Sequence, residues 1–147
     1  ELYIGDEKII GCETFWAVFN TQTRRPENLA LPHDHFEKFE SQRGTQLPFT
    51  KIEIPNTAQL IQSHRVQWSD LDIVNHVNNV KYLEWCLDCI DFTIIQNQKI
   101  DSFEMNYLKE VSLNDTVAIK QKAVEDTITF AIAREEKTCF ALQLSLK

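Results

Sequence analysis

Residues 68–82 read Trp68-Ser69-Asp70-Leu71-Asp72-Ile73-Val74-Asn75-His76-Val77-Asn78-Asn79-Val80-Lys81-Tyr82 and join a polar loop to a helical pattern. The pattern consists of apolar side chains at the i, i+3, i+4 spacing of an amphipathic helix, namely Val80, Leu83, Leu87, Ile90 and Ile94. Asn78 or Asn79 suits the N-cap, because an asparagine side chain can accept from the free N–H groups of the first turn. We therefore expect one long helix near residues 78–95, with one face buried.

The loop concentrates Asp, Asn and His side chains immediately before the N-terminus of this helix. A helix N-terminus has unpaired N–H groups and a partial positive charge, and both favour an anion. A carboxylate beside a histidine can activate water for attack on a carbonyl, and the N–H groups can stabilise the resulting oxyanion. A capping loop whose side chains only satisfy backbone groups has the same composition. The residues alone leave both interpretations open.

Strand patterns flank the loop and the helix. Leu60–Trp68 is interpreted as a strand before the loop. After the helix, apolar residues alternate with polar ones in three further segments. The apolar positions are Phe103, Met105 and Tyr107 in the first, Val117 and Ile119 in the second, and Phe140, Leu142, Leu144 and Leu146 in the third. Residues Thr127–Arg134 are expected to form another strand. The order strand, helix, several strands predicts an α+β fold with one helix against an antiparallel sheet of about four or five strands.

The first third of the chain has a different character. Residues 1–23 resemble a β-hairpin, in which Leu2-Tyr3-Ile4 leads through a turn at 5–7 to a strand from Ile9 to Phe19. Residues 26–56 hold all four prolines and show no sustained period, which is typical of a linker. Within it, the segment Pro32-His33-Asp34-His35 is interpreted as a solvated loop rather than a metal site.

Charge and hydropathy exclude several classes of function. The 147 residues include 15 basic and 22 acidic side chains, and the net charge of −7 argues against binding to a nucleic-acid backbone. No apolar run approaches the roughly 20 residues that span a bilayer, and residues 1–10 lack the features of a signal peptide. We expect no nucleic-acid partner, no membrane partner and a cytoplasmic location.

The cysteines do not indicate a cofactor. Cys86 and Cys89 form a C-x-x-C pair, but the chain has no second such pair to complete a zinc site. Their position well inside the predicted helix also differs from redox motifs, which open a helix. We expect two inert, metal-free thiols in a reducing environment, and no metal or cofactor in the protein.

Residues 68–72 and 76–82 closely resemble the loop-to-helix motif of acyl-ACP thioesterases, the double-hotdog enzymes of plants and bacteria. Two other segments resemble the same family. Trp16 with Thr23-Arg24-Arg25-Pro26 resembles the closing strand of its first hotdog domain, and Met105-Asn106-Tyr107-Leu108-Lys109-Glu110-Val111 resembles the strand that carries its second group of site residues. The resemblance covers nearly the whole chain, and the loop motif is its most specific part.

This resemblance implies a hotdog fold, in which an antiparallel sheet wraps around a long central helix. It also implies hydrolysis of fatty acyl thioesters on acyl carrier protein, with release of the free fatty acid. By position, the catalytic candidates are Asp72, His76 and Glu110. The N–H groups of Val77 and Asn78 are candidates for binding the oxyanion of the substrate.

Two positions depart from the family. Val74 stands where the family has asparagine, and Val111 stands where it often has cysteine. Valine is neither a hydrogen-bond donor nor a nucleophile, so a cysteine mechanism at 111 is excluded and water activated by Glu110 or His76 remains. Asn75 is a candidate to replace the missing amide. Losing one oxyanion donor costs about 10²–10³ in rate, so we expect weakened activity. A catalytically weak acyl-binding or structural module and an acyl-CoA thioesterase remain as alternatives.

The family also suggests domain boundaries. Residues 1–26 are expected to be the closing strands of a truncated first hotdog domain, 27–56 a linker, and 57–147 a complete hotdog thioesterase domain. Because bare strand edges tend to pair with other strands, we expect the domain to pair with another hotdog domain. That domain would be either its own missing half or a second copy.

Overall fold

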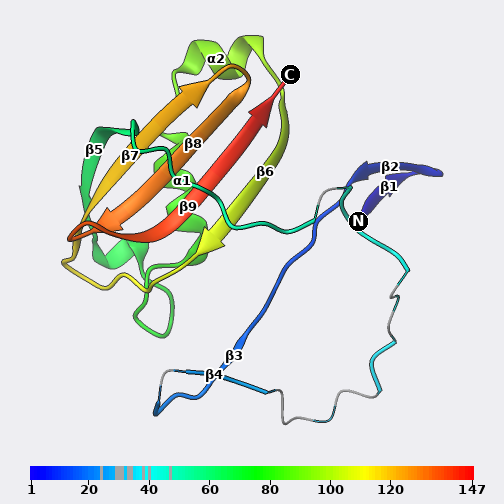
Figure 1. Ribbon diagram of the computed structural model, residues 1–147, viewed down its shortest axis with the longest axis horizontal. Coiled ribbons are helices and arrows are strands. Elements are labelled where there is room, and N and C mark those ends of the chain that lie inside the picture. Colours follow the sequence, from blue (N-terminus) through cyan, green and yellow to red (C-terminus); the bar gives the residue numbers. More distant parts are fainter. Residues whose placement is uncertain (24, 29–31, 33–34, 38, 40, 47) are drawn as a thin grey trace. The chain divides into compact units, whose positions relative to one another are not determined.

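The computed structural model describes residues 1–23, 25–28, 32, 35–37, 39, 41–46 and 48–147 (Figure 1). The chain forms two compact units, Glu1–Thr50 and Lys51–Lys147. The candidate site residues all belong to the second unit.

One antiparallel sheet of five strands forms the body of the second unit, in the order β5-β7-β8-β9-β6 (Figure 1). The strands are β5 (Gln59–Arg65), β6 (Ile100–Tyr107), β7 (Thr116–Val124), β8 (Thr127–Arg134) and β9 (Lys137–Leu146). The turn between β8 and β9 has positive φ at both Glu135 and Glu136, which matches the twist of a tight hairpin. The predicted antiparallel sheet of about four or five strands is confirmed.

The alternation of side chains along the strands determines which face of the sheet is apolar. Phe130, Phe140 and Leu142 are fully buried, and they face the helices together with the neighbouring apolar residues of β7 and β9. Ala131 and Ala141 pair on the opposite face. The core therefore lies between the sheet and the helices, as the period of two predicts.

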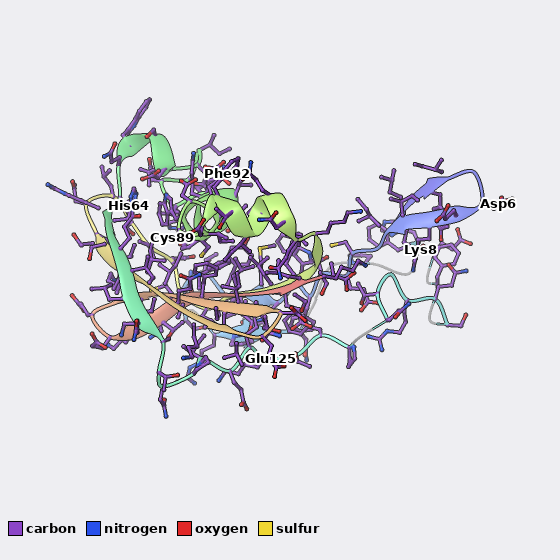
Figure 2. The ribbon with its side chains drawn as sticks, turned by 90° about the horizontal axis from the view of Figure 1, so that it is seen from above. Asp6, Lys8, His64, Cys89, Phe92 and Glu125 are labelled. Carbon is purple, nitrogen blue, oxygen red and sulfur yellow. The ribbon has the colours of Figure 1, made fainter. Side chains whose placement is uncertain are left out.

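Two short helices, not one long helix, cover this apolar face, and Figure 2 shows the helical ribbon on one side of the sheet. They are α1 (Asn79–Leu87) and α2 (Phe92–Asn97), and the 3-10 turn η1 (Trp68–Asp70) precedes them. The expectation of a continuous helix over 78–95 was wrong, because the Asp91 side chain caps a new helix start by accepting from Thr93 N–H at 2.8 Å. No helix in the described part of the chain is long and apolar enough to cross a bilayer.

The buried face of α1 also differs from the predicted stripe. Tyr82, Trp85 and Cys86 are buried, whereas Val80 and Leu87 are exposed. The reason is aromatic packing, since the Tyr82 ring stacks on Phe140 at 5.2 Å between centroids. The rings of Tyr82 and Trp85 occupy the core positions, so α1 is rotated about its axis and Val80 and Leu87 face solvent. The N-cap prediction is confirmed, because the Asn78 side chain accepts from Val80 N–H.

Residues 51–58 cross the sheet on the face opposite the helices (Figures 1 and 2). Ile52 is buried there, and its N–H donates to Asn106 Oδ1 at 2.8 Å. Residues 51–56 were expected to belong to the linker, but they form part of the second unit. Burial of Ile52 on the sheet accounts for this difference.

In the first unit, the predicted hairpin is shorter than expected. Strands β1 (Leu2–Ile4) and β2 (Glu7–Ile10) form it around Gly5, which has a positive φ. The second strand was expected to continue to Phe19, but it ends at Ile10, and β3 (Val18–Phe19) pairs separately with β4 (Pro26–Glu27). Arg24 of the arginine-proline corner and the histidine segment's His33 and Asp34 lie outside the described residues.

Candidate active site

Asp72 organises the loop before α1 through its carboxylate. Its Oδ1 accepts from the backbone N–H groups of Val74 at 2.9 Å and His76 at 3.1 Å. The Asp72 N–H in turn donates to the His76 carbonyl at 2.8 Å. Asp72 therefore orients the backbone of the loop rather than the imidazole of His76.

His76 and Glu110 lie close together, as the sequence predicts. His76 Nε2 is 3.7 Å from Glu110 Oε2, and the two side chains are 41% and 50% exposed. Backbone pairing brings them together, because His76 forms a β-bridge with Ser112 and Val77 N–H donates to Val111 O at 3.1 Å. An imidazole and a carboxylate at this separation, open to solvent, can share a bridging water and move its proton.

The Val77 and Asn78 N–H groups are not free for an oxyanion. The Val77 N–H is bonded to Val111 O, and the Asn78 N–H donates to the Asp70 carbonyl at 2.9 Å. The prediction that these two groups form the oxyanion hole is therefore wrong for this arrangement. Pairing with the distant Val111 and with the turn at Asp70 uses both donors.

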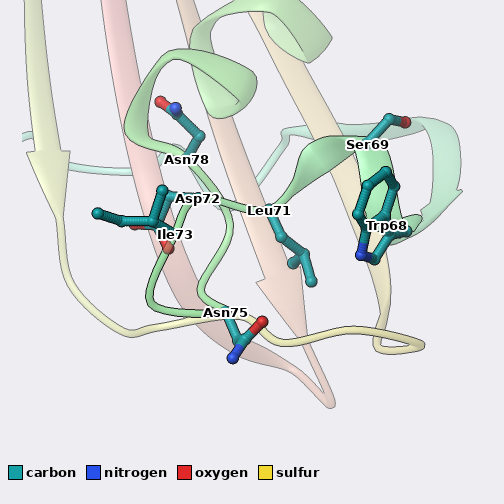
Figure 3. A pocket seen from close by; sticks show the side chains of 7 residues that line it. All are labelled: Trp68, Ser69, Leu71, Asp72, Ile73, Asn75 and Asn78. Carbon is teal, nitrogen blue, oxygen red and sulfur yellow. The ribbon is translucent and has the colours of Figure 1, made fainter.

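A surface pocket of about 790 Å³ opens beside the loop (Figure 3). Asp72 and Asn75 line it together with Asn78, whereas His76 and Glu110 lie outside its lining. Asn75 has φ 64, a left-handed conformation that asparagine tolerates better than most residues. The apolar side chain of Ile73 is fully exposed at this pocket. The loop thus offers polar groups and apolar surface on one side.

The two valines that depart from the family occupy different environments. Val74 is 60% exposed on the loop, so its position is open to solvent. Val111 is fully buried in the core. The side chain at 111 therefore serves packing, in agreement with the exclusion of a nucleophile there.

Two residues that the sequence analysis did not single out support the loop. Asp70 is only 6% exposed, and its Oδ2 lies 2.9 Å from His64 Nε2 on β5 and accepts from Gln67 N–H at 2.8 Å. The His64 ring also packs on Trp85, with 4.3 Å between centroids. Only the position of Asp70 within the motif hinted at this role, since its partner His64 lies on β5 and not in the loop.

Tyr82 lies on the core side of the same region. Burial raises the pKa of its hydroxyl to about 12, although a hydrogen bond with the Val111 backbone opposes the shift. Tyr82 therefore stays protonated at neutral pH and cannot serve as a general base there. Its ring anchors α1 on the sheet.

Among the described residues, the cysteine pair has no further metal ligands beside it. All four thiols are free, and no group of three or more potential ligands occurs among the described residues. Burial raises the pKa of the Cys86 thiol, and it raises the pKa of Cys89 as well. Both thiols are therefore protonated at neutral pH and weakly nucleophilic.

Comparison with known proteins gives one consistent family. The family model of the acyl-ACP thioesterase C-terminal domain matches residues 54–144. The dodecanoyl-[acyl-carrier-protein] hydrolase of Cinnamomum camphora is 27% identical over 128 residues, covering 76% of this chain and 31% of that protein. The palmitoyl-acyl carrier protein thioesterase of Arabidopsis thaliana is 31% identical over 113 residues, covering 71% of this chain and 27% of that protein. The chain thus spans less than a third of the length of these curated relatives, both named chloroplastic.

Solved structures support the same fold. An acyl-ACP thioesterase from Bacteroides thetaiotaomicron has a TM-score of 0.77 at 21% identity, covering 88% of this chain and 53% of that one. A 12:0-ACP thioesterase from Umbellularia californica has a TM-score of 0.64 at 21% identity, covering 88% and 52%. The predicted hotdog fold is confirmed.

Proposed function

The chain belongs to the family of acyl-ACP thioesterase C-terminal domains, and from this premise we propose that it hydrolyses fatty acyl thioesters carried on acyl carrier protein. The proposal is carried by one observation, the approach of His76 Nε2 to Glu110 Oε2 at 3.7 Å beside the start of α1. Hydrolysis of a thioester needs an activated water, and this pair can supply the acceptor for its proton. The free fatty acid and the carrier thiol are the products.

The reaction we propose has two steps. Water attacks the thioester carbonyl carbon and gives its proton to Glu110 or His76, which forms a tetrahedral oxyanion. The oxyanion then collapses, the carbon–sulfur bond breaks, and the sulfur leaves as a thiol with the returned proton. No cofactor is required, and Val111 leaves no nucleophile at its position for a covalent route.

Asp72 acts in this scheme as a positioning residue. Its bonds to Val74 N–H and His76 N–H fix the loop, and Asn75 on the same turn supplies an amide to the pocket in place of the family's asparagine at 74. The oxyanion donor that we propose is the N–H of Asn79, the first residue of α1, because the first-turn amides of a helix have no acceptor within the helix.

A weakly catalytic acyl-binding module is the second candidate function. Val74 favours it, because an exposed valine on the loop supplies no donor to a developing charge. The substrate carrier is a separate question, since coenzyme A presents the same thioester as acyl carrier protein. Fatty acid release from acyl-ACP by the purified chain tests the enzyme against the module. The same assay with acyl-CoA distinguishes the carriers.

We also propose that β6 pairs with a second hotdog domain. It is an edge strand of the described sheet, and the side chains of Ile100, Phe103 and Tyr107 are exposed along it. An edge of this kind tends to pair with another strand. Either a preceding half of the same protein or a second copy of the chain would fit. The cytoplasmic location stays a prediction.

A further inference from the structure

Asp115 holds together three segments next to the candidate site. Its Oδ2 accepts from Ser112 N–H at 2.9 Å and pairs with the guanidinium of Arg134, at the end of β8. The backbone closes the same turn, since Asp115 N–H donates to Ser112 O at 3.1 Å and Asp115 O accepts from Val66 N–H at 2.9 Å. The loop after Glu110 and the end of β8 therefore meet at the Asp115 carboxylate, and the residue after β5 bonds to the Asp115 backbone carbonyl.

Ser112 links this carboxylate to the site. It is the residue that bridges to His76, and its neighbour Val111 accepts from Val77 N–H. Glu110 lies two residues before Ser112. The pairing of 111–112 with 76–77 thus sets the distance between the Glu110 carboxylate and the His76 imidazole, and Asp115 holds one side of that pairing.

The charge state of Asp115 suits this task. Partial burial alone would raise its pKa, but the hydrogen bonds from Ser112 and Arg134 outweigh this effect and lower the pKa below the ordinary 3.8. The Arg134 pKa is raised by the same contact. At neutral pH, an ionised carboxylate accepts from Ser112 and from a charged guanidinium, which are the stronger kind of hydrogen bond.

We propose that Asp115, held by Arg134, is a positioning residue that fixes the Glu110 segment against His76. The catalytic consequence rests on the proposed function, whereas the effect on the geometry of the His76–Glu110 pair does not. Asp115 does not line the pocket beside the loop. Its removal should therefore lower kcat and leave KM nearly unchanged.

The kinetic test is a double-mutant cycle between Asp115 and Glu110 in the full chain. Asp115→Ala should lower kcat for acyl-ACP by on the order of 10²-fold, the scale of a misplaced catalytic group. In a Glu110→Gln background it should have little further effect, because both changes remove the same contribution. Arg134→Lys keeps the charge and should recover part of the rate that Arg134→Met loses. Equal losses in both backgrounds would mean a general structural role and overturn the proposal.

A spectroscopic test does not depend on whether the chain hydrolyses a thioester. The NMR signals of the His76 ring should move in Asp115→Ala, and they should also move in Glu110→Gln. Lys120→Gln is the matched control, because it breaks an exposed ion pair with Glu136 and should leave these signals in place. If Asp115→Ala proves unfolded, Asp115→Asn replaces it in both tests. A folded Asp115 variant with unchanged His76 signals would contradict the proposal, whereas a chain that hydrolyses no thioester but shows the shift would contradict only the proposed function.

Discussion

The His64 imidazole and the Asp70 carboxylate lie 2.9 Å apart and tie the strand β5 to the loop that carries the candidate site. The backbone of Asp70 also accepts from Asn78 N–H, at the cap of α1. One nearly buried residue thus fixes where the loop begins and where it ends. The loop of the candidate site is shaped by the strand before it as well as by its own turn.

Asp70→Ala should therefore destabilise the second unit. The substitution leaves the Gln67 N–H and the His64 ring without their acceptor, and an unsatisfied buried partner costs about 1–3 kcal/mol. Urea unfolding followed by tryptophan fluorescence measures the loss. Glu84→Gln is the control, because it removes an exposed i,i+3 pair with Lys81 and should change the free energy of unfolding by less than about 0.5 kcal/mol. Equal stabilities of the two variants would contradict the role of Asp70.

The stability that Asp115 provides should depend on pH. Its folded pKa lies below the ordinary 3.8, so its contribution is complete above that value and is lost as the pH falls from there through the folded pKa. The difference in free energy of unfolding between the wild type and Asp115→Asn should therefore shrink between pH 5 and pH 3. Urea titrations at both pH values measure it. A difference that stays constant or grows in acid would show that the carboxylate is not held in its charged form.

The buried thiols should react slowly. Burial keeps Cys86 protonated and inaccessible, whereas Cys12 is exposed. A thiol reagent added to the native protein should label Cys12 first and Cys86 only on unfolding, as mass spectrometry of peptides would show. Metal analysis of the same sample should find no stoichiometric zinc. Bound zinc, or labelling of Cys86 as fast as that of Cys12, would refute this assignment.

Val74→Asn should raise the hydrolysis rate. The exposed position accepts an amide without disturbing the core, and the Val74 backbone N–H keeps its bond to Asp72. A restored oxyanion donor is worth up to about 10²-fold in kcat. Val74→Leu is the control and should leave kcat as it is. If both variants turn over acyl-ACP at the wild-type rate, the missing amide does not limit this protein.

The fold was predictable where the pattern is local. The hairpins around Glu125 and Glu135 and the Asn78 cap follow from turn residues and from alternation along single segments. The break between α1 and α2 was not predictable, because Ile90 and Ile94 continue the apolar period across it. Competition for the core also shifted the buried face toward Tyr82 and Trp85, a result that depends on the partner Phe140.

The candidate site shows the same division. The proximity of His76 and Glu110 could be inferred from the family motif, although Glu110 lies in the loop after β6 and not on the strand itself. The engagement of Val77 and Asn78 N–H could not, because their acceptors are set by pairing with Val111 and by the turn at Asp70. The sequence indicates only that Asp115 belongs to a turn. Its link to His76 depends on Ser112, which bonds to Asp115 and bridges to His76 in the folded chain.

The central claim is that Glu110 and His76 act together on water. Glu110→Gln preserves the shape of the side chain but removes the proton acceptor, so kcat for acyl-ACP should fall by about 10²–10⁴-fold, the usual contribution of a general base. KM and the thermal midpoint should stay near the wild-type values, since the side chain is half exposed. Glu136→Gln, an exposed change on the β8–β9 turn, should retain full activity. The most direct measurement is therefore kcat for fatty acid release by Glu110→Gln beside the wild type: a loss of at least about 10²-fold is predicted, and turnover equal to the wild type would contradict the account.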